Sequence, residues 1–541
     1  MSSDLRCSGA QKTPRSESDI SVNFNNTNQI IAASNAVGAS NQAQFYSTDG
    51  GVTWNQTSLP LNPGDSLHSD PTVDWTSDGT AWATTIGIDA STTVLQIRAY
   101  KSTNNGAEWT FDATVTGAQT AADKQMMWVD HSPTSPHKDN IYVIWHNNNP
   151  VFVNRRTGPS GAWQAPLQVS GTETTGTGIG GDIKTNSSGD VFAFWPDTMS
   201  RRLFVAKSTD GGVVFGTPVR ISTTFDSFDI GIPSNASRRA LIYLSGGAYR
   251  TAAQDMVYAV WTDLTGVAGV PACNSPENEP NNNVDSTCKS RIWFARSSDG
   301  GATWRAATML NNQASLNDQF NPRMAVDETN GRLVVMYYDT VGDAGRQRTD
   351  VWLQTSLDVG ATWTTAVKVS SAQTDETSAG ADTGNQYGDY NGLSGYAGKF
   401  FPCWTDRRSG GKEEIWTAAI DTSGRVMVAE FASGPPVQVL YWEDWGQSPI
   451  LDGWRDPEDI QLVGDFRGLG RDQVLFINRT GSGGRVMVAD FASGPPVQVL
   501  YWEDWGQSPI LDGWHDPEDI QLVGDFRGLG RDQVLFINRP L

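Results

Sequence analysis

Five copies of one eight-residue string lie between residues 47 and 363. Three copies match Ser-x-Asp-x-Gly-x-Thr-Trp, at residues 47–54, 297–304 and 356–363. Two further copies, at 102–109 and 208–215, match it less closely. Each follows one short apolar run and precedes another, which is typical of a β-hairpin turn. The Asp or Asn accepts hydrogen bonds from the backbone of the turn, and Gly supplies its positive φ. Five such hairpins predict an all-β chain.

The repeated string resembles the Asp-box of sialidases and related β-propellers. The resemblance implies a propeller fold, and it implies that the Asp of each string has a structural role in its turn. Around the strings lie longer units of four predicted strands, and repeats of roughly 40 to 90 residues of this kind indicate propeller blades. Seven units are found. We therefore predict a sialidase-like propeller of seven blades over residues 1–420, with six blades, as in sialidases proper, as the alternative.

The last unit, 388–418, has three predicted strands and no box, and the leader 1–12 has no partner. We expect the leader to complete the seventh blade and a disulfide to link Cys7 to Cys403. A second disulfide is expected between Cys273 and Cys288, because they bracket a polar loop that cannot pack a core. With five Asn-x-Ser/Thr sequons, these cysteines favour a secreted or cell-surface protein.

From residue 424 the chain contains two nearly identical copies of one segment, 425–479 and 485–539. Residues 464–472 resemble the FG-GAP type of propeller repeat, whose calcium loop alternates acidic ligands. Arg467 and Leu469 occupy two of those places, so no metal is expected there. We predict an appended β-module over 424–541 that is a candidate for self-association.

Each copy of this tail carries an aromatic cluster beside carboxylates. The clusters contain Trp442 and Trp445 in the first copy and Trp502 and Trp505 in the second. They are candidate sugar platforms, and duplication would add avidity. The alternative is that these indoles pack between blades.

Composition excludes some classes of function. A net charge of -21 argues against a nucleic-acid partner, which requires a basic face. No run is apolar enough to span a membrane. No Cys-x-x-Cys pair indicates zinc, and we expect no cofactor.

Topology predicts which residues share the face opposite the box turns. The loops after second strands and the connections into first strands lie there, as in sialidase-like propellers. At the end of the second strand of a predicted blade, a Trp or Tyr is followed two residues later by an acidic residue. Other polar residues come just before the first strand of a blade. The candidate ligand-binding residues are Asp197, Asp263, Asp339, Asp406 and Arg407, with Asp70, Arg323, Tyr387, Asp389 and Tyr390. They predict a polar pocket with aromatic walls for sugar. The alternative is that each Trp-x-Asp closes its blade, with Asp capping backbone amides.

A sialidase would need three arginines gripping a carboxylate, a Tyr nucleophile paired with Glu, and an Asp acid/base. The catalytic candidates are Tyr387 or Tyr390, Asp70 and Arg323, with flanking arginines 201, 202, 346, 348, 407 and 408. The early Arg-Ile-Pro motif of sialidases is absent, and no Glu stands out as the partner of the tyrosine. We therefore favour a carbohydrate-binding or adhesion protein that contacts a glycan or glycoprotein surface. The alternatives are a sialidase-type glycoside hydrolase and a structural surface protein.

Overall fold

The computed structural model describes residues 4–9, 13–235, 237–266 and 288–422, and eight strands beyond them. All regular elements in these residues are β-strands. The chain divides into two compact units, Met1–Asp421 and Thr422–Leu541. Within the described residues, no helix is long and apolar enough to cross a membrane.

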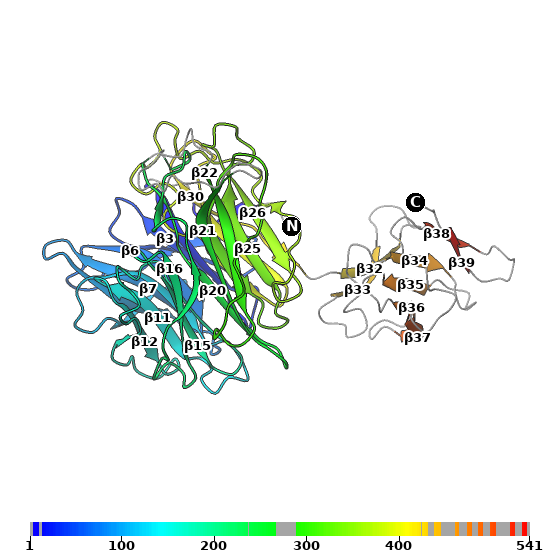
Figure 1. Cartoon of the computed structure of the whole chain (residues 1–541), viewed down its shortest axis with the longest axis horizontal. Coiled ribbons are helices and arrows are strands. Elements are labelled where there is room, and N and C mark those ends of the chain that lie inside the picture. Colours follow the sequence, from blue (N-terminus) through cyan, green and yellow to red (C-terminus); the bar gives the residue numbers. More distant parts are fainter. Residues whose placement is uncertain are drawn as a thin grey trace. The chain divides into compact units, whose positions relative to one another are not determined.

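Six sheets of the first unit each contain four consecutive antiparallel strands, and they form blades 1 to 6 (Figure 1). Blade 1 consists of β2 (Arg15–Val22), β3 (Ile30–Ala36), β4 (Ala43–Ser47) and β5 (Asn55–Ser58). Blade 2 consists of β6 (Leu67–Trp75), β7 (Ala81–Asp89), β8 (Val94–Ser102) and β9 (Thr110–Thr114). Blade 3 consists of β10 (Ala122–Val129), β11 (Ile141–Asn147), β12 (Val151–Arg156) and β13 (Leu167–Gln168).

Blade 4 consists of β14 (Asp182–Thr185), β15 (Val191–Asp197), β16 (Arg202–Ser208) and β17 (Val219–Thr223). A small hairpin, β18 (Asp229–Ile230) with β19 (Ala240–Leu241), follows it. Blade 5 consists of β20 (Ser245–Arg250), β21 (Asp255–Gly266), β22 (Cys288–Ser297) and β23 (Thr308–Met309). Blade 6 consists of β24 (Gln319–Val326), β25 (Leu333–Asp339), β26 (Asp350–Ser356) and β27 (Val367–Lys368).

The seventh blade joins the two ends of the first unit. It contains β28 (Gly392–Tyr396), β29 (Lys399–Asp406) and β30 (Glu414–Thr417), with β1 (Leu5–Arg6) paired antiparallel to β30 and β31 (Ile420–Asp421) paired to β29. The first strands of neighbouring blades contact one another in a closed circle, because β2 contacts both β6 and β28. Seven blades are therefore confirmed, the six-bladed alternative is wrong, and the leader completes the last blade as predicted.

The cysteine predictions have different outcomes. Cys7 and Cys403 are both buried and lie against each other, but both are free thiols, so the predicted bond is not present in this structure. Burial, together with the neighbouring Cys403, raises the pKa of the Cys7 thiol well above its usual value. Cys273 lies outside the described residues, and its link to Cys288 stays a prediction.

The repeated strings form the turns between the third and fourth strands of their blades. In the first turn, Ser47 Oγ accepts the Gly51 amide at 2.9 Å, and the Asp49 carboxylate accepts the amide and hydroxyl of Thr53 at 2.9 and 2.6 Å. Trp54 Nε1 donates to the Gly51 carbonyl at 3.0 Å. The same bonds recur in 297–304. The Asp of each string thus organises its turn.

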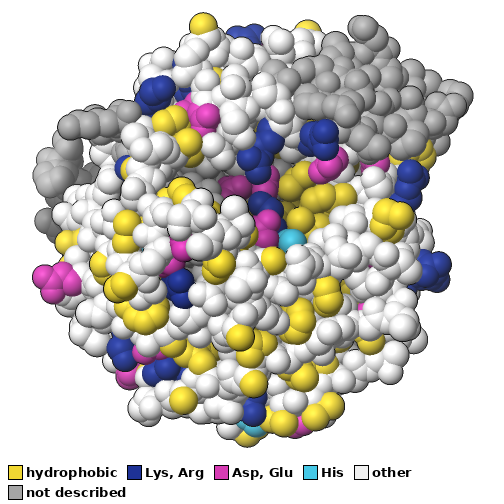
Figure 2. Space-filling view, turned by 90° about the vertical axis from the view of Figure 1, so that its left-hand side faces the viewer, with side chains coloured by type: hydrophobic (Ala, Val, Ile, Leu, Met, Phe, Trp, Pro, Cys, Tyr) yellow, Lys and Arg dark blue, Asp and Glu magenta, His cyan; other side chains and the backbone are white. Residues whose placement is uncertain are grey.

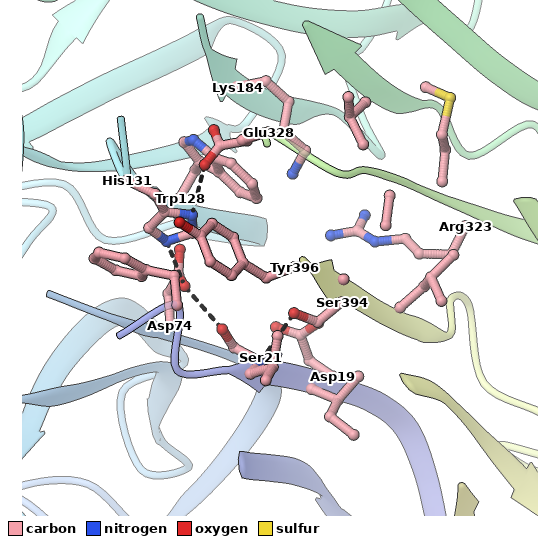
Figure 3. A pocket seen from close by; sticks show the side chains of 18 of the residues that line it. Asp19, Ser21, Asp74, Trp128, His131, Lys184, Arg323, Glu328, Ser394 and Tyr396 are labelled. Atoms are coloured by element: carbon pink, nitrogen blue, oxygen red, sulfur yellow. Dashed lines mark hydrogen bonds and ion pairs between the residues drawn. The ribbon is translucent and has the colours of Figure 1, made fainter. Parts of the chain in front are cut away.

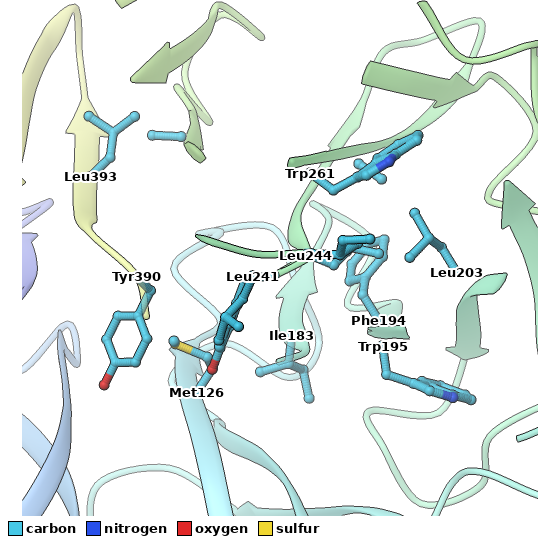
Figure 4. Packing of buried hydrophobic residues seen from close by; sticks show 14 of the residues in the cluster. Met126, Ile183, Phe194, Trp195, Leu203, Leu241, Leu244, Trp261, Tyr390 and Leu393 are labelled. Carbon is cyan, nitrogen blue, oxygen red and sulfur yellow. The ribbon is translucent and has the colours of Figure 1, made fainter. Parts of the chain in front are cut away.

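The core lies between the faces of neighbouring blades. Second strands supply large aromatic side chains that are fully buried, among them Trp82, Trp145, Trp195, Trp261, Tyr337 and Trp404. Figure 4 shows Trp195 and Trp261 in one buried cluster with Phe194, Leu203 and Leu244. The aromatic residue of each Trp-x-Asp motif is therefore a core residue.

The second unit contains antiparallel sheets formed by β32 (Arg425–Glu430), β33 (Gln438–Asp444), β34 (Ile460–Gly464), β35 (Gln473–Asn478), β36 (Arg485–Asp490), β37 (Gln498–Asp504), β38 (Ile520–Gly524) and β39 (Gln533–Ile537). Its four-stranded sheet, β34-β35-β36-β37, joins the second hairpin of one copy to the first hairpin of the next. Trp442 lies in β33 and Trp502 in β37. Trp445 and Trp505 lie outside the described residues, so the sugar-platform prediction stays open.

We expect closure by β1 to contribute measurably to stability. The Cys7 amide donates to the Ile415 carbonyl at 2.8 Å, and proline at this position removes that donor. Cys7→Pro should lower the free energy of unfolding by about 2 kcal/mol relative to Cys7→Ala, which keeps the amide. Urea unfolding of both variants measures this, and equal stability would show that the pairing at Cys7 does not hold the ring.

Candidate functional site

The innermost strands of four blades are interrupted at the same place by a bulge. The interruptions fall between Ser16 and Asp19, Ser69 and Thr72, Asp123 and Met126, and Phe320 and Arg323. One residue in each has a left-handed φ: Glu17 (52°), Asp70 (56°), Lys124 (55°) and Asn321 (49°). For a non-glycine residue this conformation costs on the order of 1–3 kcal/mol, and such strain concentrates at functional sites. The bulges lie near the start of each inner strand, at the face opposite the box turns, which we call the mouth.

Three carboxylates and two cations meet at this mouth. We call Glu17, Asp70, Lys124, Arg238 and Asp389 the mouth cluster. Lys124 Nζ pairs with Asp389 and lies 3.8 Å from Asp70 Oδ2 and 4.0 Å from Glu17 Oε1. Arg238 also pairs with Asp389 and lies 3.5 Å from Glu17. The three carboxylates are buried. The bulges of blades 1, 2 and 3 thus converge with the segment that leads into blade 7.

Neighbouring polar groups fix the orientation of two of these carboxylates. Asn35 Nδ2 donates to Glu17 Oε2 at 2.7 Å, and Asn35 Oδ1 accepts the Asp70 amide at 2.9 Å. Ser69 Oγ donates to Asp70 Oδ1 at 2.6 Å. The second oxygen, Asp70 Oδ2, accepts no hydrogen bond from any described residue. A buried carboxylate oxygen normally has such a partner, so Asp70 has a free acceptor at the mouth.

The mouth cluster shifts the pKa values of two of its carboxyls in opposite directions. Burial, followed by the charge of Asp70, raises the pKa of Glu17 well above its usual value. Burial also acts to raise the pKa of Asp389, but Lys124 and Arg238 outweigh it and hold that pKa at about 2. Neighbouring groups with pKa values pushed apart are characteristic of acid and base pairs in active sites.

A cavity of about 380 Å³ opens beside the cluster between blades 1 and 2. It is lined, among others, by Asn35, Ser40, Ser66, His68, Ser69 and Asn385. Its volume falls in the range of small-molecule sites. No residue of the mouth cluster lines the cavity itself, but Asn35 and Ser69 connect its wall to Glu17 and Asp70 through the hydrogen bonds above.

Further along the axis lies a narrower channel pocket, seen in Figure 3. Inner-strand side chains alternate in direction, so Asp19 and Ser21 of β2 both face it. Arg323 lies here, 3.4 Å from Asp182, which also pairs with Lys184 at 3.0 Å. The cavity holds about 50 Å³, room for a few water molecules and too little for a sugar. The channel therefore holds Arg323 in an ion pair rather than in an open sugar site.

His131 occupies the far end of this channel pocket, between two carboxylates. Its Nε2 lies 2.9 Å from Asp74 and its Nδ1 lies 3.5 Å from Glu328 (Figure 3). Burial alone would lower the imidazole pKa, but Asp74 and Glu328 outweigh it and raise it to about 10. His131 is therefore a cation at neutral pH.

The two predicted tyrosines are separated by the fold. Tyr390 lies beside the mouth cluster, where its hydroxyl donates to the Pro71 carbonyl at 3.3 Å and its ring lies 5.5 Å from that of Tyr243. Tyr387 instead packs against Phe320 and Tyr338. Burial raises the pKa of both predicted phenols well above the usual value. Both stay neutral at pH 7, and of the two only Tyr390 lies beside the mouth cluster.

The four acids of the Trp-x-Asp motifs accept hydrogen bonds from the protein. The Asp263 carboxylate accepts three backbone amides, those of Phe225, Asp226 and Leu264, at 2.7 to 3.1 Å. Asp197 accepts backbone amides of the same kind, Asp339 accepts two side-chain amides and a backbone amide, and Asp406 accepts the Trp404 indole and Arg408. The capping alternative therefore describes the hydrogen bonds of these acids, and their place in a sugar pocket stays a prediction.

The predicted arginines are also engaged within the fold. Arg407 donates to the carbonyls of Gly411 and Ala379 at 2.9 and 2.8 Å and lies 3.6 Å from Glu413, so it shapes a loop. Arg346 pairs with Asp318, and Arg408 pairs with Asp406 and Asp4. These arginines do not form the carboxylate grip that a sialidase requires.

Two members of the mouth cluster, Glu17 and Arg238, were missed by the sequence interpretation. Glu17 lies inside a first strand, where the alternation of residue types gives no sign of a bulge. Arg238 precedes β19, a strand of the extra hairpin that lies outside the four-strand blade pattern. Asp70 and Asp389 were candidates, and the structure brings them together around Lys124. Figure 2 shows one face hollowed at its centre, where charged side chains of both signs and a histidine are visible.

No family model and no curated protein matches this chain. Solved propeller structures do match. A protein of unknown function from Dyadobacter fermentans is 13% identical, covering 78% of this chain and 98% of its own, with a TM-score of 0.40. The GH93 α-L-arabinofuranosidase of Fusarium graminearum, solved with arabinobiose, is 11% identical, covering 77% and 97%, with a TM-score of 0.40. A Hadza microbial sialidase is 13% identical, covering 60% and 63%, with a TM-score of 0.37.

We expect the His131 ion pairs to make stability depend on pH. The pKa of His131 in the folded protein, about 10, exceeds the ordinary imidazole value of about 6.5. The ion pairs therefore contribute fully to the free energy of unfolding below about pH 6.5, and this contribution is lost as the pH rises through 10. His131→Gln leaves the buried Asp74 and the partly buried Glu328 without their cation and should cost about 3 kcal/mol at pH 6.

The difference from wild type should shrink between pH 7 and pH 10 in chemical unfolding followed at several pH values. His137→Gln is the control, because His137 does not line the channel pocket. A cost for His131→Gln that stays constant with pH would contradict a charged His131.

Proposed function

We propose that the chain is a glycoside hydrolase that acts on a neutral glycan at the mouth cluster. One observation carries the proposal: carboxyls with divergent pKa values lie beside a cavity of sugar size. Glycoside hydrolysis needs a carboxylic acid and a carboxylate on either side of the scissile bond. The strained backbone at Glu17 and Asp70 supports the assignment, because such strain persists where it serves a site.

Glu17 is the general acid in this mechanism. Its raised pKa favours the protonated form, and the acid gives its proton to the glycosidic oxygen as the bond from this oxygen to the anomeric carbon breaks. Asp70 is the second carboxylate, and its Oδ2, which accepts no hydrogen bond from the described residues, would face the developing positive charge. It either attacks the anomeric carbon or takes the proton of the water that does.

The spacing of the two groups suits either course. Glu17 Oε1 and Asp70 Oδ2 both lie within 4.0 Å of Lys124 Nζ, so they are at most about 8 Å apart. This limit admits the separation of retaining enzymes, about 5–5.5 Å, and the shorter separations of inverting enzymes, which begin at about 6.5 Å. Lys124 and Arg238 keep Asp389 ionised, and this fixed carboxylate stabilises a cationic transition state.

The charges at the mouth favour a neutral sugar over an anionic one. With Glu17 protonated as the acid, the charges of Asp70 and Asp389 are balanced by those of Lys124 and Arg238. Arg323, the strongest arginine candidate from the sequence, is paired with Asp182 inside the channel, so none of these cations is left to bind a sialic acid carboxylate. We therefore propose a neutral-glycan hydrolase in preference to the sialidase alternative, located outside the cell or on its surface.

The second candidate is glycan binding without turnover, which the sequence alone favoured. The observation in its favour is burial: Glu17 is 2% exposed and Asp70 is 4% exposed, so a substrate must approach through the adjoining cavity. A lectin could use the same cavity through Asn35 and Ser69. The assay below separates the two.

Loss of the acid should abolish turnover. On a panel of aryl pentosides and hexosides with poor leaving groups, Glu17→Gln should lower kcat about 10³-fold, because the leaving oxygen is no longer protonated. Asp70→Asn should have a loss of similar size. Glu108→Gln is the matched control, since Glu108 is exposed on the face of the box turns.

Initial rates with each glycoside, and with an aryl sialoside beside them, measure this. Turnover of the sialoside alone would contradict a neutral substrate. Absent turnover, together with glycan-array binding that Asn35→Ala removes, would leave the binding protein as the function.

A further inference from the structure

A second cavity of about 380 Å³ lies between blades 4 and 5 and shares no lining residue with the mouth cluster. Its walls come from the end of β17, the segment after it, and the central strands of blade 5. They include Ser222, Thr224, Phe225, Trp261, Thr265 and Trp293. The cavity therefore combines aromatic surface with hydroxyl groups.

Two tryptophans share one side of this cavity. Trp261 of β21 and Trp293 of β22 are directly opposite in the antiparallel pair, so their side chains project to the same face of the sheet. Trp261 is 1% exposed and belongs to the buried cluster of Figure 4, whereas Trp293 is partly exposed. One indole is thus fixed in the core, and the other is open to a ligand.

Both indole N–H groups lack an acceptor within the described part of the chain. An indole N–H that is buried normally donates a hydrogen bond, because leaving it unpaired costs about 1–3 kcal/mol. Two such donors, on residues that line one cavity of this size, point to an acceptor that the described residues do not supply.

The chemistry of the lining restricts that acceptor. Asp263 is the one charged residue among the lining residues, and its carboxylate is already bound to the amides of Phe225, Asp226 and Leu264. No free charge selects an ion. A sugar ring fits, because its C–H face packs on an aromatic ring while its oxygens accept from N–H groups.

We infer that this cavity is a second glycan-binding site, specific for a neutral saccharide and separate from the mouth cluster. It holds its ligand by contact with Trp293 and by hydrogen bonds from the two indoles. It requires no proton transfer, so it does not rest on the proposed hydrolysis.

The test uses the full chain with Glu17→Gln, so that no probe is consumed. Xylohexaose, cellohexaose, mannohexaose and arabinohexaose are titrated by calorimetry, with tryptophan emission as a second readout. At least one probe should bind. Trp293→Phe, which keeps an aromatic ring and removes the N–H, should weaken that binding about tenfold. Ala307→Trp should abolish it, because Ala307 lines the cavity and a larger side chain would fill it.

Trp352→Phe is the matched control. Trp352 occupies the corresponding position of blade 6, opposite Tyr337, and its indole N–H is also without an acceptor in the described residues, but it does not line the cavity. The Trp352→Phe variant should bind the hexasaccharide as tightly as the Glu17→Gln parent does. The inference is overturned if no hexasaccharide binds the parent, or if Trp293→Phe and Ala307→Trp bind as the parent does. Turnover of aryl glycosides by Trp293→Phe, in a chain that keeps Glu17, reports on the mouth cluster alone. Failure of the proposed hydrolysis is therefore distinguishable from failure of the second glycan site.

Discussion

Pairing of β1 with β30 is the contact on which the geometry of the mouth depends. The ring closes between blades 7 and 1, and the mouth cluster spans that junction, since Glu17 comes from β2 and Asp389 precedes β28. The Asp389 amide lies 3.3 Å from Glu17 Oε1, and a side chain at Gly388 would collide with the Glu17 backbone. Opening the ring would separate the acid from the groups that tune it. Closure therefore removes an exposed sheet edge and also assembles the candidate site.

Burying charged side chains along the propeller axis costs free energy, and the two ends of the channel differ in how their buried charges are paired. In the channel pocket, Asp182 with Lys184 and Arg323 forms a compensated group around a cavity for a few waters. At the mouth, Glu17, Asp70 and Asp389 are buried around Lys124, the backbone is strained, and Asp70 Oδ2 accepts no hydrogen bond from the described residues. Replacing buried ion pairs by apolar groups is often neutral or stabilising, so stability alone does not account for such a cluster. The catalysis that we propose at the mouth would account for it.

Much of the fold was predictable from the sequence, because the box strings mark a fixed place in each blade and the turn chemistry of Ser, Asp, Gly and Trp is local. The site was less predictable. Trp-x-Asp recurs because its acids cap backbone amides, so repetition indicated structure and not function. The bulges that turn Glu17 and Lys124 towards the axis each add a residue to a strand. Side-chain direction in a strand is inferred from the alternation of apolar and polar residues, and an added residue breaks that alternation. Arg238 enters the cluster from a connection whose path depends on tertiary packing.

Both cavities of sugar size lie towards the same face of the ring. Asn35 and Thr265, which line one cavity each, lie near the ends of the second strands of blades 1 and 5, and second strands end at the mouth face. A polymer held at the tryptophan cavity would therefore be retained on the face where the mouth cluster lies. Tethering of this kind raises the effective concentration of the remaining chain without a new contact at the reacting bond. If both proposals hold, such tethering would favour a long glycan over a small glycoside, so the two sites together would select for substrate length, and neither cavity would do so alone.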